Sequence, residues 1–152
     1  MPTENYCMMR SATNTRLLLL GALLGAAACA SDSTSPASVE GNYGAIIFVT
    51  TPTGGSARNE LQAGSTLTIN LNSNGTTSGH LHAAANGATP VFDADMAGTW
   101  SVSGDVVTFT QAADTFVRDM AFTIQRIGGN VVVLVGDQVF SGTRINLTLA
   151  RG

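Results

Sequence analysis

The feature that most constrains this chain is an alternation of apolar and polar residues that stops at short, glycine-containing turns. Leu67, Ile69 and Leu71 alternate with threonine and asparagine, and a period of two places such side chains on one face of a β-strand. The sequence Ser73-Asn74-Gly75 follows, and Asn and Gly tolerate the positive φ that hairpin turns require. We therefore expect residues 76–85 to return antiparallel to the strand 67–71.

The same pattern recurs downstream, where further turns are predicted at 103–105 and 128–130. The nearest candidate for a helix, residues 58–64, is short and ends in glycine, so it is given one turn at most. Consecutive antiparallel strands joined by hairpins predict an all-β fold, an eight-stranded up-and-down barrel, with a β-sandwich as the alternative. The eight expected strands are 43–50, 67–71, 76–85, 96–102, 106–111, 116–127, 131–136 and 143–149.

Length and charge narrow the function classes. The chain has 152 residues, the length of about one domain. It contains no lysine, and its seven arginines are outnumbered by ten acidic residues, which gives a net charge of -3. Nucleic-acid binders carry the opposite balance of charge. We therefore expect one folded domain that does not bind nucleic acid.

An apolar segment near the start of the chain predicts an export signal. Arg10 and Arg16 precede the uncharged run 17–28, which is the pattern of a signal peptide. Twelve helical residues span about 18 Å, short of the roughly 30 Å hydrocarbon core of a bilayer. The run is therefore expected to be a cleaved signal and not a permanent membrane helix.

The run ends at Ala26-Ala27-Ala28-Cys29, which resembles the lipobox of bacterial lipoproteins. The resemblance implies that Cys29 is lipidated and becomes the first residue of the mature protein. Ala30 follows the cysteine, and by the same resemblance it favours the outer membrane, facing the periplasm, within the bacterial cell envelope. A plain secretory signal, cut near Ala28 or Ala30, is the alternative.

The positions of the cysteines agree with the predicted lipoprotein signal, because removal of the signal also removes Cys7 and leaves Cys29 as the single thiol. Met8 and Met9 offer a later start of translation, which would exclude residues 1–7. The expected organisation has three parts: a signal peptide at 1–28, the lipidated cysteine with a flexible polar tether at 29–38, and a barrel domain at 39–152.

Two segments of the expected barrel, residues 67–76 and 98–110, resemble the small lipocalin-like lipoproteins of bacteria, most of which are uncharacterised. The resemblance extends over most of residues 39–151. It implies a lipocalin-like barrel held at the membrane by its lipid anchor, and its turn and strand motifs specify the fold better than an activity.

Large side chains on the predicted strands provide a candidate ligand site inside the barrel. Arg118 shares a face with Met120 and Phe122 on the expected strand 116–127. It is therefore either an interior cation that receives a carboxylate, or a sign that the strand begins after it. Small residues are abundant on the strands, which favours a cavity for an apolar or amphipathic ligand. The expected ligand-binding residues are Trp100, Phe109, Arg118, Met120 and Phe122.

The two histidines of the chain form a second candidate site. His80 and His82 are two residues apart on an expected strand, so both imidazoles lie on one face. They could bind a metal such as zinc or copper with Asp93 or Asp95 from the next loop. The alternative is that this face is simply polar and solvated.

Catalytic signatures are absent from the sequence. It has no Gly-x-Ser-x-Gly, Cys-x-x-Cys or His-Glu-x-x-His motif and no phosphate-binding glycine loop. We therefore expect a protein that is not an enzyme and that uses no cofactor. The expected function is binding of a small apolar ligand. The alternatives are a structural or protein-interaction module of the envelope and a metal-binding protein.

Overall fold

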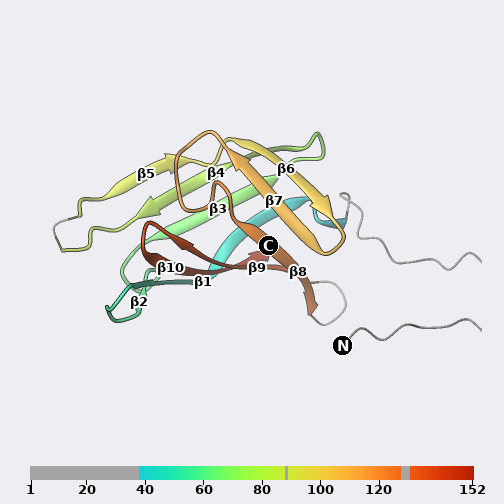
Figure 1. Cartoon of the computed structure of the whole chain (residues 1–152). Coiled ribbons are helices and arrows are strands. Elements are labelled where there is room, and N and C mark those ends of the chain that lie inside the picture. The colour runs from blue at the N-terminus through green and yellow to red at the C-terminus, as the bar shows by residue number, and fades with distance from the viewer. Residues whose placement is uncertain (1–37, 88, 128–130) are drawn as a thin grey trace, which may run out of the picture. The chain divides into compact units, whose positions relative to one another are not determined.

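Figure 1 shows the computed structural model, which describes residues 38–87, 89–127 and 131–152. The predicted signal peptide, Cys29, the tether up to residue 37 and the predicted turn 128–130 lie outside the described residues. The described part of the chain contains no helix long and apolar enough to cross a membrane. Its strands are β1 (Gly41–Pro52), β2 (Arg58–Asn59), β3 (Thr66–Leu71), β4 (Thr76–Ala83), β5 (Phe92–Asp95), β6 (Gly98–Ser103), β7 (Val106–Gln111), β8 (Ala121–Ile127), β9 (Val131–Phe140) and β10 (Thr143–Arg151).

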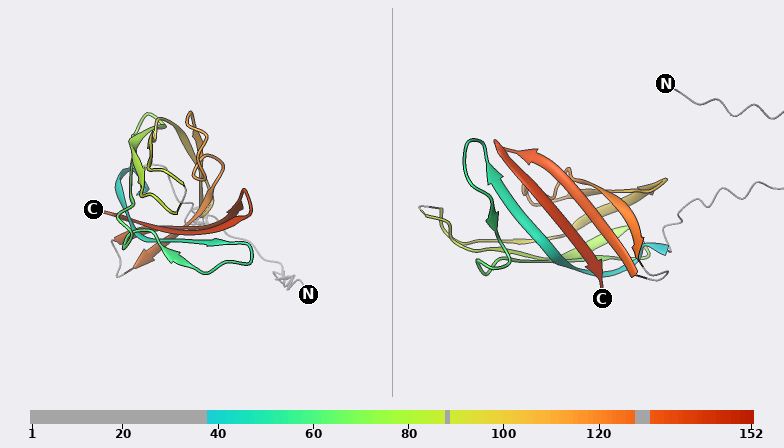
Figure 2. Two further views of the ribbon diagram at one scale, coloured as in Figure 1. Left: turned by 90° about the vertical axis from the view of Figure 1, so that its left-hand side faces the viewer. Right: turned by 90° about the horizontal axis from the view of Figure 1, so that it is seen from below.

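Eight of these strands form a closed antiparallel barrel. The order around the barrel is β1-β3-β4-β6-β7-β8-β9-β10, and β10 returns to pair with β1. This seam runs from Tyr43 opposite Arg151 to Pro52 opposite Thr143. The predicted up-and-down barrel is confirmed and the sandwich is excluded, because closure joins the first and last strands. Figure 2 shows the strands curving around a common interior.

Two short strands were not expected. β2 pairs with β1 at Val49 and Thr50, and β5 pairs with β4, with Phe92 opposite Ala83 and Asp95 opposite His80. Both lie outside the barrel order. From the sequence, the segment 92–95 is expected to be a solvated loop, because two of its four residues are aspartates. This segment pairs with β4 through its backbone, and the sequence pattern does not reveal that pairing.

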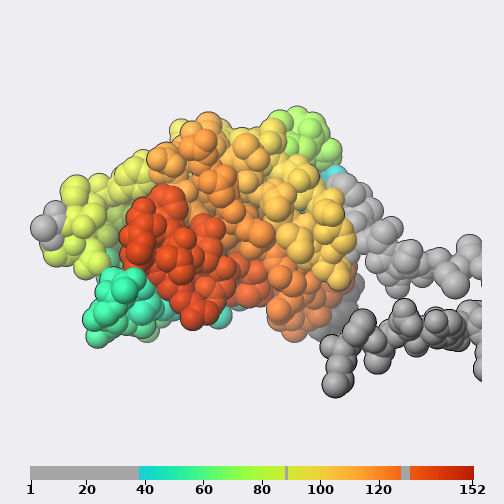
Figure 3. Space-filling model, in the orientation of Figure 1, coloured from blue at the N-terminus to red at the C-terminus, as the bar shows by residue number. Residues whose placement is uncertain are grey.

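The expected strand over residues 116–127 begins only at Ala121, so the prediction for 116–120 is wrong. The segment between β7 and β8 instead folds over one end of the barrel. The Phe116 ring lies 5.2 Å from the Phe48 ring, and the side chain of Gln138 donates a hydrogen bond to the Phe116 carbonyl. Val117 and Met120 are fully buried. Figure 3 shows this orange segment packed beside β9 and β10, drawn in red.

The core lies inside the barrel and follows the alternation seen in the sequence. Leu67, Ile69 and Leu71 are each 1% exposed, while Thr66 and Thr68 on either side of Leu67 face solvent. The turn after β3 is also as predicted: Gly75 has a φ of 80°, and its amide donates to the Asn72 carbonyl at 3.0 Å.

Candidate functional site

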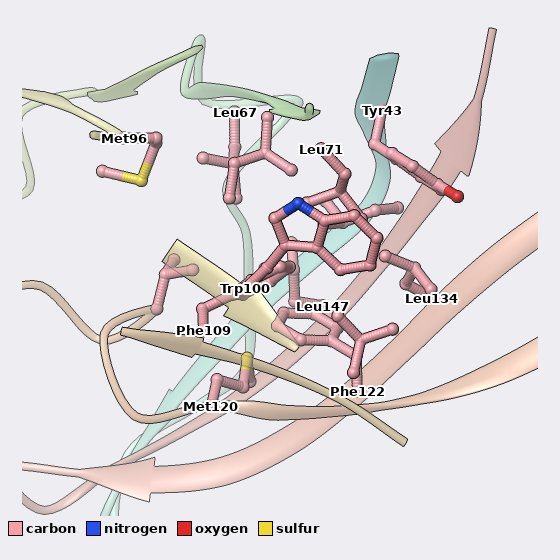
Figure 4. Close-up of a cluster of buried hydrophobic side chains, with 14 of the residues drawn as sticks. Tyr43, Leu67, Leu71, Met96, Trp100, Phe109, Met120, Phe122, Leu134 and Leu147 are labelled. Carbon is pink, nitrogen blue, oxygen red and sulfur yellow. The ribbon is translucent and has the colours of Figure 1, made fainter. Parts of the chain in front are cut away.

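The structure brings four of the five predicted ligand-binding residues together inside the barrel (Figure 4). Trp100 on β6 is paired directly with Phe109 on β7. The Phe109 ring lies 5.0 Å from that of Phe122 on β8, and Met120 precedes that strand. All four are 7% exposed or less. Strand alternation predicts this inward orientation for Trp100, Phe109 and Phe122.

These side chains pack directly against one another. Gly136 on β9 lies opposite Phe122, and a Cβ atom added to it would lie 2.8 Å from Phe122 Cε1 and 2.9 Å from Met120 Sδ. The indole of Trp100 donates from Nε1 to the Asn72 carbonyl at 2.9 Å. An eight-stranded barrel has an interior that side chains can just fill. Around this cluster the interior is occupied by packed side chains.

Arg118 does not join the cluster. It lies in the segment before β8, its side chain is 47% exposed, and its Nη1 is 3.4 Å from Asp114 Oδ1. Of the two alternatives that the sequence left open, the later start of the strand is the one observed. The segment that carries Arg118 folds over the barrel because Phe116, Val117 and Met120 bury themselves, which leaves the guanidinium in solvent.

The two histidines and two aspartates do come together, on the outer face of the β4–β5 hairpin. His80 is paired with Asp95 and His82 with Asp93. Asp93 Oδ1 lies 2.7 Å from His82 Nδ1 and 3.2 Å from His80 Nε2, and His80 Nδ1 lies 3.3 Å from Asp95 Oδ1. We call these four residues the His–Asp cluster.

The hydrogen bonds of this cluster shift the proton affinities of its members. Bonds to Asp93 and then to Asp95 raise the pKa of His80 above its usual value of 6.5. Bonds from His82 and then from His80 lower the pKa of Asp93 below 3.8. One ring nitrogen of each histidine therefore contacts the same oxygen, Asp93 Oδ1. Among the described residues no group of three or more His, Cys, Asp or Glu side chains is arranged to hold a metal ion.

A hollow that the sequence did not predict lies on the outer face of the barrel. β1 pairs with β3 only from Gly41 to Gly44. A bulge at Ile46 follows, because Ala45 and Ile47 face consecutive residues of β10. Beyond the bulge β1 pairs with β2 in place of β3. A bulge bends its strand, so β1 turns away from β3 and leaves a crease of about 670 Å³.

The walls of this hollow differ in chemistry. β1 and β10 contribute mostly small and apolar residues, including Gly44, Ala45, Ile46 and Ala150, together with the polar Asn42. The facing strands contribute polar groups, Thr68 and Asn70 on β3 and Ser78 on β4. At one edge lies Arg151, whose Nη1 donates to the Ser38 and Glu40 carbonyls at 3.1 and 3.3 Å.

Two glycines shape the hollow, and their positions inside strand patterns could have indicated it from the sequence. At Gly44 an added Cβ would meet nothing within 4 Å, so the surface there is open. At Gly79 the φ is +133°, and a Cβ would lie 2.2 Å from the Thr68 carbonyl oxygen, so only glycine lets β4 approach β3 this closely. A glycine inside a strand pattern is a known signal of a bulge or a close backbone approach.

A scan of protein-family models and a search of curated proteins find no match to this sequence.

Proposed function

We propose that this chain is an envelope lipoprotein without enzymatic activity, whose barrel binds a small apolar or amphipathic ligand in the outer hollow between β1, β3 and β4. The observation that carries the proposal is the hollow itself, whose volume of about 670 Å³ falls in the usual range of roughly 300 to 1,000 Å³ for ligand sites. Lipocalin-like ancestry and an outer-membrane location belong to the same proposal and are supported by the sequence resemblances.

The two walls suggest how such a ligand lies. Its apolar part would contact Gly44, Ala45 and Ile46, where burial of each methylene contributes about 0.8 kcal/mol. Its polar part would face Asn70 and Ser78, which offer an amide and a hydroxyl. This division matches an amphipathic molecule better than a purely apolar one.

The outer hollow is favoured over the barrel interior because of the packing at Gly136. The rings that would line an internal site already touch, and the segment 112–120 covers one end of the barrel. A ligand inside would have to displace these side chains, whereas the outer hollow is already formed.

Filling the hollow should weaken ligand binding. We expect N-phenyl-1-naphthylamine to bind saturably to the wild type, and Gly44→Phe to weaken binding by about tenfold or more, because two lost methylene contacts already exceed 1.4 kcal/mol. Thr123→Phe adds the same ring to the exposed outer face of β8 and is the matched control. Fluorescence titration measures both affinities.

The same titration separates the two binding sites. Trp100 is part of the interior cluster. Saturable binding that shifts Trp100 emission and survives Gly44→Phe would place the ligand inside and contradict the outer site. Native mass spectrometry of protein purified from its own membranes would then show the mass of the natural ligand.

Anchoring is tested at Cys29. The proposal predicts that Cys29→Ser moves the protein from the membrane fraction to the soluble fraction, because the acyl chains that hold it are lost. Intact-mass analysis of the wild type should show the mass of the lipid on the first residue. Equal membrane retention of the variant, with an unmodified wild-type terminus, contradicts the anchor.

A protein-interaction module is the second candidate. Ile46 and Ile47 on β1 are 56% and 45% exposed, and adjacent exposed apolar side chains are typical of interaction surfaces. Absence of saturable ligand binding, together with loss of a co-purifying protein in Ile47→Ser, would favour it.

A further inference from the structure

The end of the barrel at which the described chain begins carries exposed apolar side chains. Ile127 on β8 and Val131 on β9 are paired directly with each other, and they are 57% and 48% exposed. They alternate with the inward-facing Ile124 and Val132, so they point out of the barrel. We call Arg126, Ile127 and Val131 the β8–β9 end.

The start of the described chain is fixed to this same end. Arg126 Nη2 donates to Ser38 Oγ at 3.1 Å, and Arg151 Nη1 donates to the Ser38 carbonyl at 3.1 Å. Figure 1 shows the beginning of β1 and the end of β8 at the right of the barrel. Any chain that enters at Ser38 therefore enters beside Ile127 and Val131.

The position of the anchor relative to Ser38 decides which surface this end meets. Ser38 is the ninth residue after Cys29, and fully extended chain spans at most about 30 Å over that length. A short tether keeps the tethered end at a high effective concentration near its anchor, so that even a weak contact is populated. The opposite end of the barrel, at Val139 of β9, lies about 26 Å farther along the strand than Val131.

We propose that the β8–β9 end rests on the phospholipid leaflet in which Cys29 is anchored, with Ile127 and Val131 at the acyl boundary and Arg126 at the level of the headgroups. The inference rests on the proposed lipid anchor and adds an orientation to it. Apolar side chains flanked by arginine suit a membrane interface, because the guanidinium stays hydrated while its stem covers apolar surface.

A single introduced thiol tests this orientation in the anchored protein. Acylation blocks Cys29 and signal cleavage removes Cys7, so Val131→Cys provides the sole free thiol for an environment-sensitive dye. Val139→Cys is the matched control, because Val139 lies on the same strand, is 69% exposed and sits at its other end. The labelled proteins are reconstituted in vesicles of phosphatidylethanolamine and phosphatidylglycerol that carry brominated acyl chains.

We expect bromine to quench the dye at position 131 at least about twofold more than the dye at position 139, because interfacial side chains reach roughly 5 to 10 Å into the leaflet. Ile127→Ser should reduce quenching at 131, whereas Phe92→Ser, at an exposed phenylalanine of β5, should leave it unchanged. Equal quenching at 131 and 139 in vesicle-bound protein overturns the orientation and leaves the anchor intact. Protein that does not remain with the vesicles overturns both proposals.

Discussion

Gly136 is a residue at which the packed interior has no room for added volume. A Cβ atom there would lie within 3 Å of both Phe122 and Met120, and both side chains are fully buried away from solvent. Gly136→Ala should therefore lower the free energy of unfolding by about 1 to 3 kcal/mol, the usual cost of overpacking. Urea denaturation measures the change.

Gly44→Ala is the matched control for that substitution. Gly44 is also a strand glycine, but its added Cβ would meet nothing within 4 Å. The urea midpoint of the Gly44→Ala variant should stay the same or rise slightly, because alanine restricts the unfolded chain. Equal loss of stability in the two variants would mean that the interior is not packed as described.

At the scale of single residues, the sequence predicts what depends on local chemistry. Gly75 was expected to hold a positive φ, and it does. The inward positions of Trp100, Phe109 and Phe122 follow from strand alternation and are also confirmed. Arg118 could not be placed, because its position depends on where β8 begins, which is decided by long-range packing of Phe116 and Met120.

At the scale of elements, the β4–β5 hairpin carries a pH-dependent contribution to stability from the His–Asp cluster. Because its pKa is raised, His80 stabilises the hairpin fully below the usual histidine pKa of 6.5. This stabilisation is lost as the pH rises through the raised pKa. Because its pKa is lowered, Asp93 stabilises the hairpin fully above its usual pKa of 3.8. This stabilisation is lost as the pH falls through the lowered pKa. The cluster therefore stabilises the hairpin most between these two usual pKa values.

Asp93→Asn tests this window. The difference in melting temperature between wild type and variant should be largest between pH 3.8 and 6.5, and it should shrink at higher pH and in high salt, because the pairs are exposed. NMR titration should show the pKa of His80 falling toward its usual value. Asp119→Asn, at an exposed aspartate outside the cluster, should change neither measurement.

The elements that the sequence missed share a physical cause. β5 is short and bears exposed aspartates, so it has no apolar pattern, and its existence depends on backbone pairing with β4. The hollow depends on β1 exchanging β3 for β2 as its partner. Periodicity within one segment predicts that a strand exists, but not which neighbour it pairs with at each position.

At the scale of the whole molecule, the two ends of the barrel domain are neighbours. The Gly152 amide donates to the Asn42 carbonyl at 3.0 Å. A circular permutant that joins Gly152 to Ser38 and opens between Gly54 and Gly55, in the exposed loop after β1, should therefore fold. Its unfolding free energy should stay within about 2 kcal/mol of the parent, since new termini at exposed loops are well tolerated.

The control opens the same joined chain inside β10, between Leu147 and Thr148, where both residues are buried and paired with β1. This permutant should not fold. Far-ultraviolet circular dichroism distinguishes the two outcomes. Similar spectra and midpoints for the two permutants would contradict the closure of the barrel through β10.

The seam between β1 and β10 also sets the time at which the barrel comes into existence. Tyr43 of β1 pairs with Arg151 of β10. A contact across about a hundred residues of chain forms slowly compared with local hairpins. Until the last strand has left the ribosome, β1 has no partner on that side, and the interior cannot be sealed. For the export that we propose, this order of events leaves the barrel open until β10 has crossed the membrane.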